Sequence, residues 1–369
     1  MAVLKHSEVI SAIPSQFEKA KASGALLFYP STVHRSEEHG VNFEISTCPA
    51  LQKKPTLPAP DFVKQDKPDP FAPPYVSDLH VGELKDQLDG DEYVILLNKF
   101  SVIPGHFLMV TKDFVPQDTP LTPSDLTQAY LLIRAARKSS SPVFAFYNCG
   151  KDSGASQPHK HVQLIPTRED EADEDEEEEG GRRPPIEALA SRLTLEDEKK
   201  IFALPLPYVH LVHKLDLPKS TVSGLKPLAE QPLEQLSQKL TSAFISLLDE
   251  AFQSVRRYHA SDPTDSTSIT STSYNVLLTS EHMHLIPRRR ELTQDVLHPV
   301  HEEGKAEEKD EAYTPQQLSV NALGFAGMLL AKSDAEMRAI QAKGVVELLT
   351  QVGVPKVEAV AEEEGPLAS

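Results

Sequence analysis

The stretch FYNCGKDSGASQPHKHVQLIP (146–166) decides the fold and the chemistry of this chain. It joins an apolar strand, a turn rich in glycine and small hydroxyl residues, and a second strand. His159, His161 and Gln163 alternate along that second strand. Alternate residues of a strand point to the same face, about 7 Å apart. The sequence therefore predicts a row of two imidazoles and an amide on one face.

The turn before this row has the composition of an anion-binding site. Asn148 closes the first strand, and SGASQ (153–157) offers backbone N–H groups and hydroxyls. A neutral imidazole can attack phosphorus near pH 7, because its reference pKa is about 6.5. Amide, lysine and backbone donors would stabilise the added charge on the phosphoryl oxygens. The pattern favours phosphoryl or nucleotidyl transfer.

Other interpretations of the histidines stay open at this point. Two histidines on a strand could bind a metal, or could be a polar strand face. Gln163 and the SGASQ turn favour transfer over both. A second pair, His282-Met283-His284, has neither a glutamine two residues on nor a Gly-Ser turn. We expect it to be structural, as in a decayed duplicate.

Composition excludes several classes of protein. The 369 residues contain 37 Lys+Arg and 55 Asp+Glu, a net charge of −18, which argues against a broadly basic nucleic-acid binder. Two cysteines support neither a zinc quartet nor a disulfide framework. The N-terminus is too polar for a signal peptide, and no run of about 18 apolar residues exists. We expect a protein of the cytoplasm or nucleus, without a membrane partner.

One acidic run divides the chain. Residues 169–179 hold ten carboxylates in eleven positions, which repel one another and favour a solvated insertion over a docking or metal-binding segment. We expect the run to be dispensable. The predicted parts are a catalytic N-terminal part (1–168), the acidic insertion (169–183), a C-terminal half completing the fold and pocket (184–355), and an acidic tail (356–369).

The two halves show similar patterns. Each predicts a helix, an apolar strand containing Asn, and a His-X-His strand ending in Leu-Ile-Pro, which suggests a duplicated α+β unit. Thr122, Pro123 and Asp125 predict a helix start, and Ser333 begins another. Further expected elements are strands at 93–100, 106–111, 141–150, 159–166, 204–217, 273–280 and 282–289, and a helix at 233–258.

At this level of detail the chain resembles a known family. FYNxGxxSGASQxHKHxQ is similar to the signature of the fungal diadenosine tetraphosphate phosphorylases, also called ATP adenylyltransferases, in the histidine-triad and galactose-1-phosphate uridylyltransferase superfamily. Segments in the family's order are LQKKP, LNKFSVIPGHFLMVTKDFVPQ, PLTPSDL, SYNVLLT, LIPRR and NALGFAGML. The resemblance implies an α+β fold: a histidine-triad-like antiparallel sheet with flanking helices, duplicated or extended as in the uridylyltransferase branch.

The resemblance also implies a mechanism. His161 takes AMP from diadenosine tetraphosphate and expels ATP, and inorganic phosphate then releases ADP. His159 orients His161, and the rate should fall below about pH 6 as the nucleophile is protonated. Gln163 stands where the hydrolases carry a third histidine, and it favours transfer over hydrolysis. Alternatives are a dinucleoside polyphosphate hydrolase and a non-enzymatic nucleotide- or metal-binding module.

The implied ligands are small molecules: dinucleoside polyphosphates, ATP, ADP and phosphate, bound by a monomer with no nucleic acid. Mg²⁺ is expected with the polyphosphate, and neither a metal ligand set nor a structural zinc is expected. His282-Met283 departs from the family's usual aromatic-Met pair, which weakens the second-half assignments. Lys53 could replace Lys54. The implied substrate contacts are Lys54, Asn98, Lys99, Asn148, Gly154, Ala155, Ser156, Gln157, Gln163, Asn275, Thr279 and Arg288.

Overall fold

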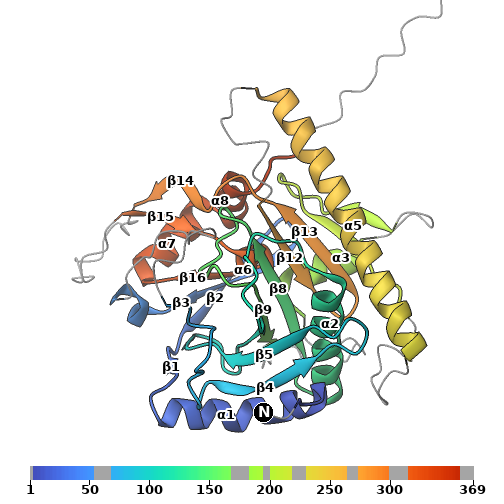
Figure 1. Cartoon of the computed structure of the whole chain (residues 1–369). Coiled ribbons are helices and arrows are strands. Elements are labelled where there is room, and N and C mark those ends of the chain that lie inside the picture. The colour runs from blue at the N-terminus through green and yellow to red at the C-terminus, as the bar shows by residue number, and fades with distance from the viewer. Residues whose placement is uncertain are drawn as a thin grey trace, which may run out of the picture.

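A nine-stranded antiparallel sheet forms the centre of the molecule (Figure 1). The computed structural model describes residues 3–53, 68–167, 183–193, 200–217, 230–263, 273–298 and 315–357. In spatial order the strands are β10 (Ile201–Ala203), β11 (Leu211–Lys214), β13 (His282–Pro287), β12 (Tyr274–Leu278), β8 (Val143–Cys149), β9 (His161–Pro166), β7 (Phe107–Thr111), β5 (Glu92–Leu97) and β4 (His80–Lys85). The expected α+β class with an antiparallel sheet is confirmed.

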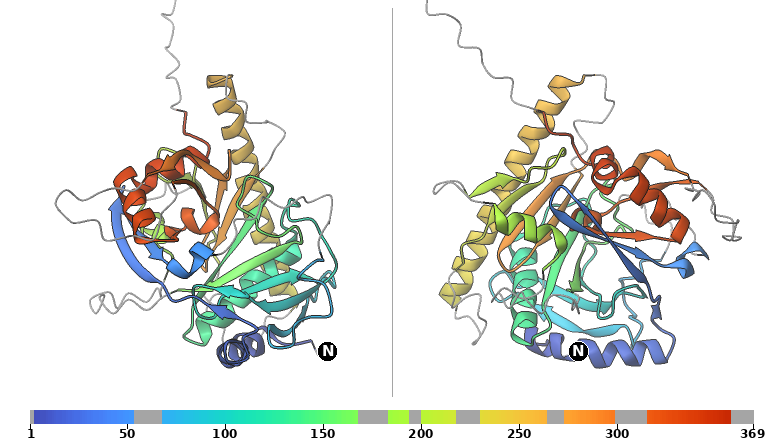
Figure 2. Two further views of the ribbon diagram at one scale, coloured as in Figure 1. Left: turned by 90° about the vertical axis from the view of Figure 1, so that its left-hand side faces the viewer. Right: turned by 180° about the vertical axis from the view of Figure 1, so that it is seen from behind.

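Three helices cover one face of this sheet (Figure 2). They are α1 (His6–Ala22), α2 (Pro123–Lys138) and α5 (Glu230–Ser261). The start of α2 is the predicted one, since Thr122 Oγ1 accepts from the Asp125 N–H at 3.1 Å and the Asp125 carboxylate accepts from the Thr122 N–H at 2.8 Å. This face holds a continuous apolar core between sheet and helices.

Smaller elements cover the opposite face. A second sheet has the order β16 (Met328–Ala331), β3 (Val41–Thr47), β2 (Thr32–Glu38), and β3 pairs with β16 in parallel. Strands β2 and β3, from the N-terminal part of the sequence, therefore form a sheet with a strand from the C-terminal part. The remaining elements are α3 (Pro185–Arg192), α6 (Ala322–Phe325), α7 (Asp334–Lys343), α8 (Val345–Val352), the 3-10 helix η1 (Pro49–Lys53), and the pairs β1 (Leu27–Phe28) with β6 (Phe100–Ser101) and β14 (Leu292–Leu297) with β15 (Gln316–Ser319).

The two halves meet where β8 pairs with β12, and Asn148 lies opposite Asn275. From there β9 flanks β8, and β13 flanks β12. Gln163 lies opposite Phe146, and His284 lies opposite Leu277, the neighbour of Phe146 across the junction. Gln163 and His284 therefore lie in one row across the sheet. Because β9 and β13 run in opposite directions, His161 and His282 lie on opposite sides of this row.

Several predicted strands are shorter than expected. The segment 93–100 forms β5 only as far as Leu97, and Phe100 belongs to β6 in another sheet. The segment 204–217 forms a strand only at β11, because Pro205 and Pro207 have no N–H to donate to a ladder. The 159–166 strand begins at His161, and His159 makes a lone bridge with Pro116. The acidic run 169–179 lies outside the described residues. No helix in the described part of the chain has the length and apolarity needed to cross a membrane.

Candidate active site

His161 begins β9 and points to the sheet face opposite α1, α2 and α5. It lies opposite Val110 of β7, which belongs to the small apolar cluster on that face. Its Nδ1 lies 2.8 Å from the carbonyl oxygen of His159, so Nδ1 carries the proton and Nε2 keeps its lone pair. Burial lowers the pKa of His161 to about 4, so the ring is neutral at pH 7. These are the properties of an imidazole nucleophile.

A fully buried glutamine fixes the main chain at this point. The Gln117 Oε1 accepts from the His161 N–H at 2.7 Å, and its Nε2 donates to the Asn148 carbonyl oxygen at 2.8 Å. One side chain thus ties the start of β9 to the end of β8. Sequence reasoning missed Gln117, although it closes a segment that resembles the family.

Gln163 is held by a second histidine that sequence reasoning also missed. His106 Nε2 lies 3.0 Å from the Gln163 Oε1, and its Nδ1 lies 2.9 Å from Asn98 Nδ2. Since an amide oxygen only accepts, His106 donates from Nε2 and accepts at Nδ1. Burial lowers the pKa of His106 to about 4 and keeps it neutral. The chain of hydrogen bonds from Asn98 through His106 fixes the amide orientation of Gln163. In the sequence, the feature that could have revealed His106 is its position as a polar residue directly after the Pro-Gly turn.

The glycine turn is packed against the C-terminal half. Gly154 has φ +78°, and a Cβ there would lie 2.7 Å from the Val320 carbonyl oxygen and 2.8 Å from Asn321 Cβ. Only glycine fits this position. Ala155 is buried, Gln157 is half-buried and Ser156 is exposed. The turn is therefore rigid at Gly154 and open to solvent at Ser156.

Asn275 and Arg288 support this turn from behind. Asn275 Nδ2 donates to Asn148 Oδ1 at 2.8 Å and to the Ser153 carbonyl oxygen at 2.9 Å. The Arg288 guanidinium donates to Asn275 Oδ1 at 2.6 Å and to Ser153, Val320, Arg290 and Val352 carbonyl oxygens. Burial lowers the pKa of Arg288 to about 9, which leaves it charged at pH 7. The side chains of both residues therefore bond to other protein groups and support the structure of the turn.

The other predicted contacts are dispersed. Thr279 lies in the β12–β13 turn, where its Oγ1 accepts from the His282 N–H at 2.9 Å. Lys99 is exposed, with its Nζ 5.6 Å from the centroid of the Phe100 ring. Lys54 lies outside the described residues, and Lys53 ends η1. The bonds join the predicted residues in two groups. One contains His159, His161, Asn148, Asn275 and Arg288, with Gln117 between His161 and Asn148. The other contains Gln163 and Asn98, joined by His106.

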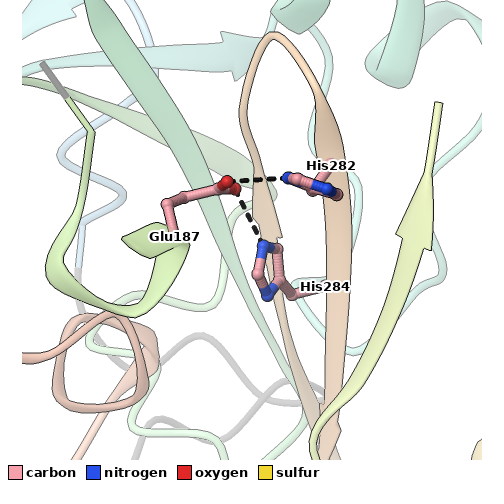
Figure 3. Close-up of side chains that lie close together, drawn as sticks. All are labelled: Glu187, His282 and His284. Carbon is pink, nitrogen blue, oxygen red and sulfur yellow. Dashed lines mark hydrogen bonds and ion pairs between the residues drawn. The ribbon is translucent and has the colours of Figure 1, made fainter. Parts of the chain in front are cut away.

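The second His-X-His pair forms a closed cluster with a glutamate from α3 (Figure 3). Glu187 Oε2 lies 2.7 Å from His282 Nδ1, and its Oε1 lies 2.9 Å from His284 Nε2. His210 Nε2 lies 3.0 Å from His284 Nδ1. These bonds outweigh burial and hold the pKa of Glu187 well below its usual range. Glu187, His282 and His284 offer the donor types that zinc prefers, within 4.8 Å of one another, and in this structure Glu187 bonds to both histidines.

Comparisons with known proteins agree with this geometry. The model of the Ap4A phosphorylase N-terminal domain matches residues 1–178, and that of the ATP adenylyltransferase C-terminal domain matches residues 204–355. Diadenosine 5',5'''-P1,P4-tetraphosphate phosphorylase 2 of Saccharomyces cerevisiae is 30% identical over 329 residues, 87% of this chain and 86% of the relative. Protein APA1 of the same yeast is 26% identical over 355 residues, 95% of each chain.

The fold also matches a solved structure. The crystal structure of yeast Ap4A phosphorylase Apa2 in complex with Ap4A superposes with a TM-score of 0.65 and 25% identity, covering 96% of this chain and 100% of that one. Fold, site and relatives together define a nucleotidyltransferase. The chain belongs to the Ap4A phosphorylase family, and the resemblance expected from the sequence is confirmed.

Proposed function

We propose that the protein phosphorolyses diadenosine tetraphosphate (Ap4A) to ADP and ATP through AMP bound to His161. His161 Nε2 forms a bond to the phosphorus of one terminal AMP unit, and the P–O bond to the departing ATP breaks. A phosphate oxygen then bonds to that phosphorus, the N–P bond breaks, and ADP leaves. One observation carries the proposal: a neutral buried imidazole whose Nδ1–H is tied to the His159 carbonyl, which leaves Nε2 to attack.

Gln163 favours phosphate over water as the acceptor. Water must lose a proton as it attacks, so hydrolysis benefits from a general base. A glutamine amide has no proton to exchange near neutral pH, and its oxygen is occupied by His106. Phosphate is already an anion with an unprotonated oxygen and needs no base. Hydrolysis would therefore need a general base that Gln163 cannot provide, whereas transfer to phosphate needs none.

Charge on the polyphosphate needs compensation during transfer. Mg²⁺ entering with the substrate would supply it by neutralising charge on the polyphosphate. In the described part of the chain, the carboxylate bonded beside the nucleophile is that of Asp69. It accepts a hydrogen bond from His159 at 2.7 Å. We therefore propose that the ion binds with the phosphates. The proposed ligands are Ap4A, ATP, ADP and phosphate. We also propose a monomer, located in the cytoplasm or nucleus.

The test separates transfer, hydrolysis and binding. The protein is incubated with Ap4A and Mg²⁺, with and without phosphate, and the nucleotides are separated. ADP and ATP formed only with phosphate support the proposal, whereas AMP and ATP formed without phosphate would establish a hydrolase. His161→Ala should abolish both turnover and acid-labile labelling by radioactive Ap4A. His159→Ala should still become labelled, but more slowly.

A further inference from the structure

We infer that Asp69 is a positioning residue for nucleotidyl transfer, which acts on His161 through the ring and carbonyl of His159. The inference rests on the proposed function and adds to it a residue that lies far from the catalytic motif in sequence. Asp69 precedes β4 in the chain, and its carboxylate reaches His159 across the sheet face.

Polar atoms hold the His159 ring at both nitrogens. Nδ1 lies 2.7 Å from Asp69 Oδ2. Nε2 lies 2.8 Å from the Thr111 carbonyl oxygen and 3.2 Å from that of Asp113. The ring is 1% exposed, so neither nitrogen is available to a substrate. The His159 imidazole therefore bonds only to protein groups, whereas His161 keeps one nitrogen for the substrate.

These contacts fix the orientation of the ring. The Asp69 carboxylate is an acceptor only, so the Nδ1–H of His159 donates to it. Nε2 also lies 3.1 Å from the Thr111 hydroxyl, which can donate or accept. Removing the carboxylate would leave the buried Nδ1–H without its acceptor, which allows the ring to move.

The His159 main chain transmits this restraint to the nucleophile. Its carbonyl oxygen accepts the Nδ1–H of His161 at 2.8 Å. As the N–P bond forms, the His161 ring becomes positively charged, and this acceptor stabilises the charge. The peptide group that bears this carbonyl is also held through its N–H, since the Lys160 N–H donates to the Val115 carbonyl oxygen at 2.7 Å. Anchoring of the His159 ring restrains the same residue through its side chain.

Asp69 also positions an aromatic wall. Its second oxygen, Oδ1, accepts from the Phe71 N–H at 2.9 Å. The centroid of the Phe71 ring lies 5.1 Å from that of His161 and 6.0 Å from that of His159, both edge-on. The Asp69 carboxylate therefore restrains two neighbours of His161. One is His159, whose carbonyl accepts its Nδ1–H, and the other is the Phe71 ring. Neither contact requires Asp69 to touch substrate.

The first test compares Asp69→Asn with Asp78→Asn, a carboxylate of the same segment that pairs with Lys19 on α1 at 3.0 Å. The rate of radioactive AMP transfer to the protein, measured without phosphate, should fall about 10- to 100-fold in Asp69→Asn. It should stay within about twofold in Asp78→Asn. Ap4A affinity, measured in the His161→Ala background, should be unchanged by Asp69→Asn. Labelling at the wild-type rate in Asp69→Asn overturns the inference.

A double variant shows whether Asp69 acts through His159. If it does, adding Asp69→Asn to His159→Gln should slow labelling no further than His159→Gln alone. Independent, multiplying losses would contradict that route. The unfolding midpoint of each variant is recorded in parallel, and a lost labelling rate counts only for proteins that remain folded.

A spectroscopic readout keeps the inference separate from the proposed function. Imidazole ¹⁵N chemical shifts of the wild type should show a protonated Nδ1 on His159 and a single Nδ1–H tautomer on His161. In Asp69→Asn, the Nδ1 shift of His159 should change and His161 should show both tautomers. Unchanged ¹⁵N shifts in Asp69→Asn refute the role of Asp69, whether or not the wild type is labelled. Wild type that takes no label, with altered shifts in Asp69→Asn, refutes the proposed function alone.

Discussion

Asn148 and Asn275 face each other across the junction of the two halves, and Asn275 Nδ2 donates to Asn148 Oδ1 at 2.8 Å. Asn148 lies near the end of β8, and Asn275 lies near the start of the antiparallel strand β12. The pair connects the end of β8 to the charged support that Arg288 provides. The catalytic turn of the N-terminal half thus depends on a side chain from the C-terminal half.

Asn275→Ala should lower the free energy of unfolding by about 2–4 kcal/mol, because it leaves the buried Arg288 guanidinium and Asn148 Oδ1 each short of a partner. Urea unfolding measures this. Asn42→Ala, at an exposed position of β3, is the control and should change stability by less than about 0.5 kcal/mol. Equal effects of the two substitutions would show that the junction bond contributes nothing special.

The acidic limb of the rate profile should lie lower than the reference imidazole pKa implies. Burial places the pKa of His161 at about 4, so the neutral nucleophile persists through pH 6 and is lost only as the pH approaches 4. This revises the fall below about pH 6 expected from sequence. The single-turnover labelling rate between pH 4 and 8 measures it, and a midpoint near 6.5 would contradict the effect of burial.

Gln163→His should open the site to water. An imidazole at this position can take a proton from water, so AMP and ATP should form without phosphate at least about tenfold faster than in wild type. Gln157→His, in the glycine turn, is the matched control and should not raise hydrolysis. If Gln163→His leaves the requirement for phosphate intact, the acceptor is chosen by something other than the amide.

Stability should fall in mild acid. The folded pKa of His106 is about 4, below its ordinary value of 6.5, so the unfolded chain binds a proton first as the pH falls. The contribution is complete above pH 6.5 and is lost towards pH 4, about 3 kcal/mol for one such group. His106→Gln should therefore flatten the fall in urea stability between pH 6.5 and 4.5. His34→Gln, on the partly exposed strand β2, should leave the slope unchanged.

The glutamate cluster should be stable without an ion. Glu187 bonds to both His282 and His284, and His284 bonds to His210, so hydrogen bonds within the cluster already join these residues and chelation should leave the unfolding midpoint unchanged. Glu187→Ala should cost about 3–5 kcal/mol, because it leaves two buried imidazoles without their acceptor. A stoichiometric metal in the purified protein, with a midpoint that falls on chelation, would show instead that the cluster is a metal site.

Local patterns predicted a large part of this molecule. The apolar strands, the Thr122 cap and the His161–Gln163 row follow from rules that act over a few residues. Asp69, His106, Gln117 and Glu187 could not be found in this way. Each reaches its histidine or amide partner from a distant segment, and nothing local distinguishes it from an ordinary polar side chain.

The different surroundings of the two His-X-His motifs could not be predicted for a related reason. His161 Nδ1 bonds to a main-chain carbonyl oxygen, whereas His282 and His284 bond to the Glu187 carboxylate. Glu187 lies on a separate helix, so no pattern local to the histidines reveals this contact.

The parallel pairing of β3 with β16 has a consequence for biosynthesis. During translation β3 emerges early and can pair at once only with its neighbour β2. Its other edge stays open until β16, close to the C-terminus, leaves the ribosome. The nascent chain therefore carries an exposed strand edge through most of its synthesis, and the last elements made close the first sheet begun.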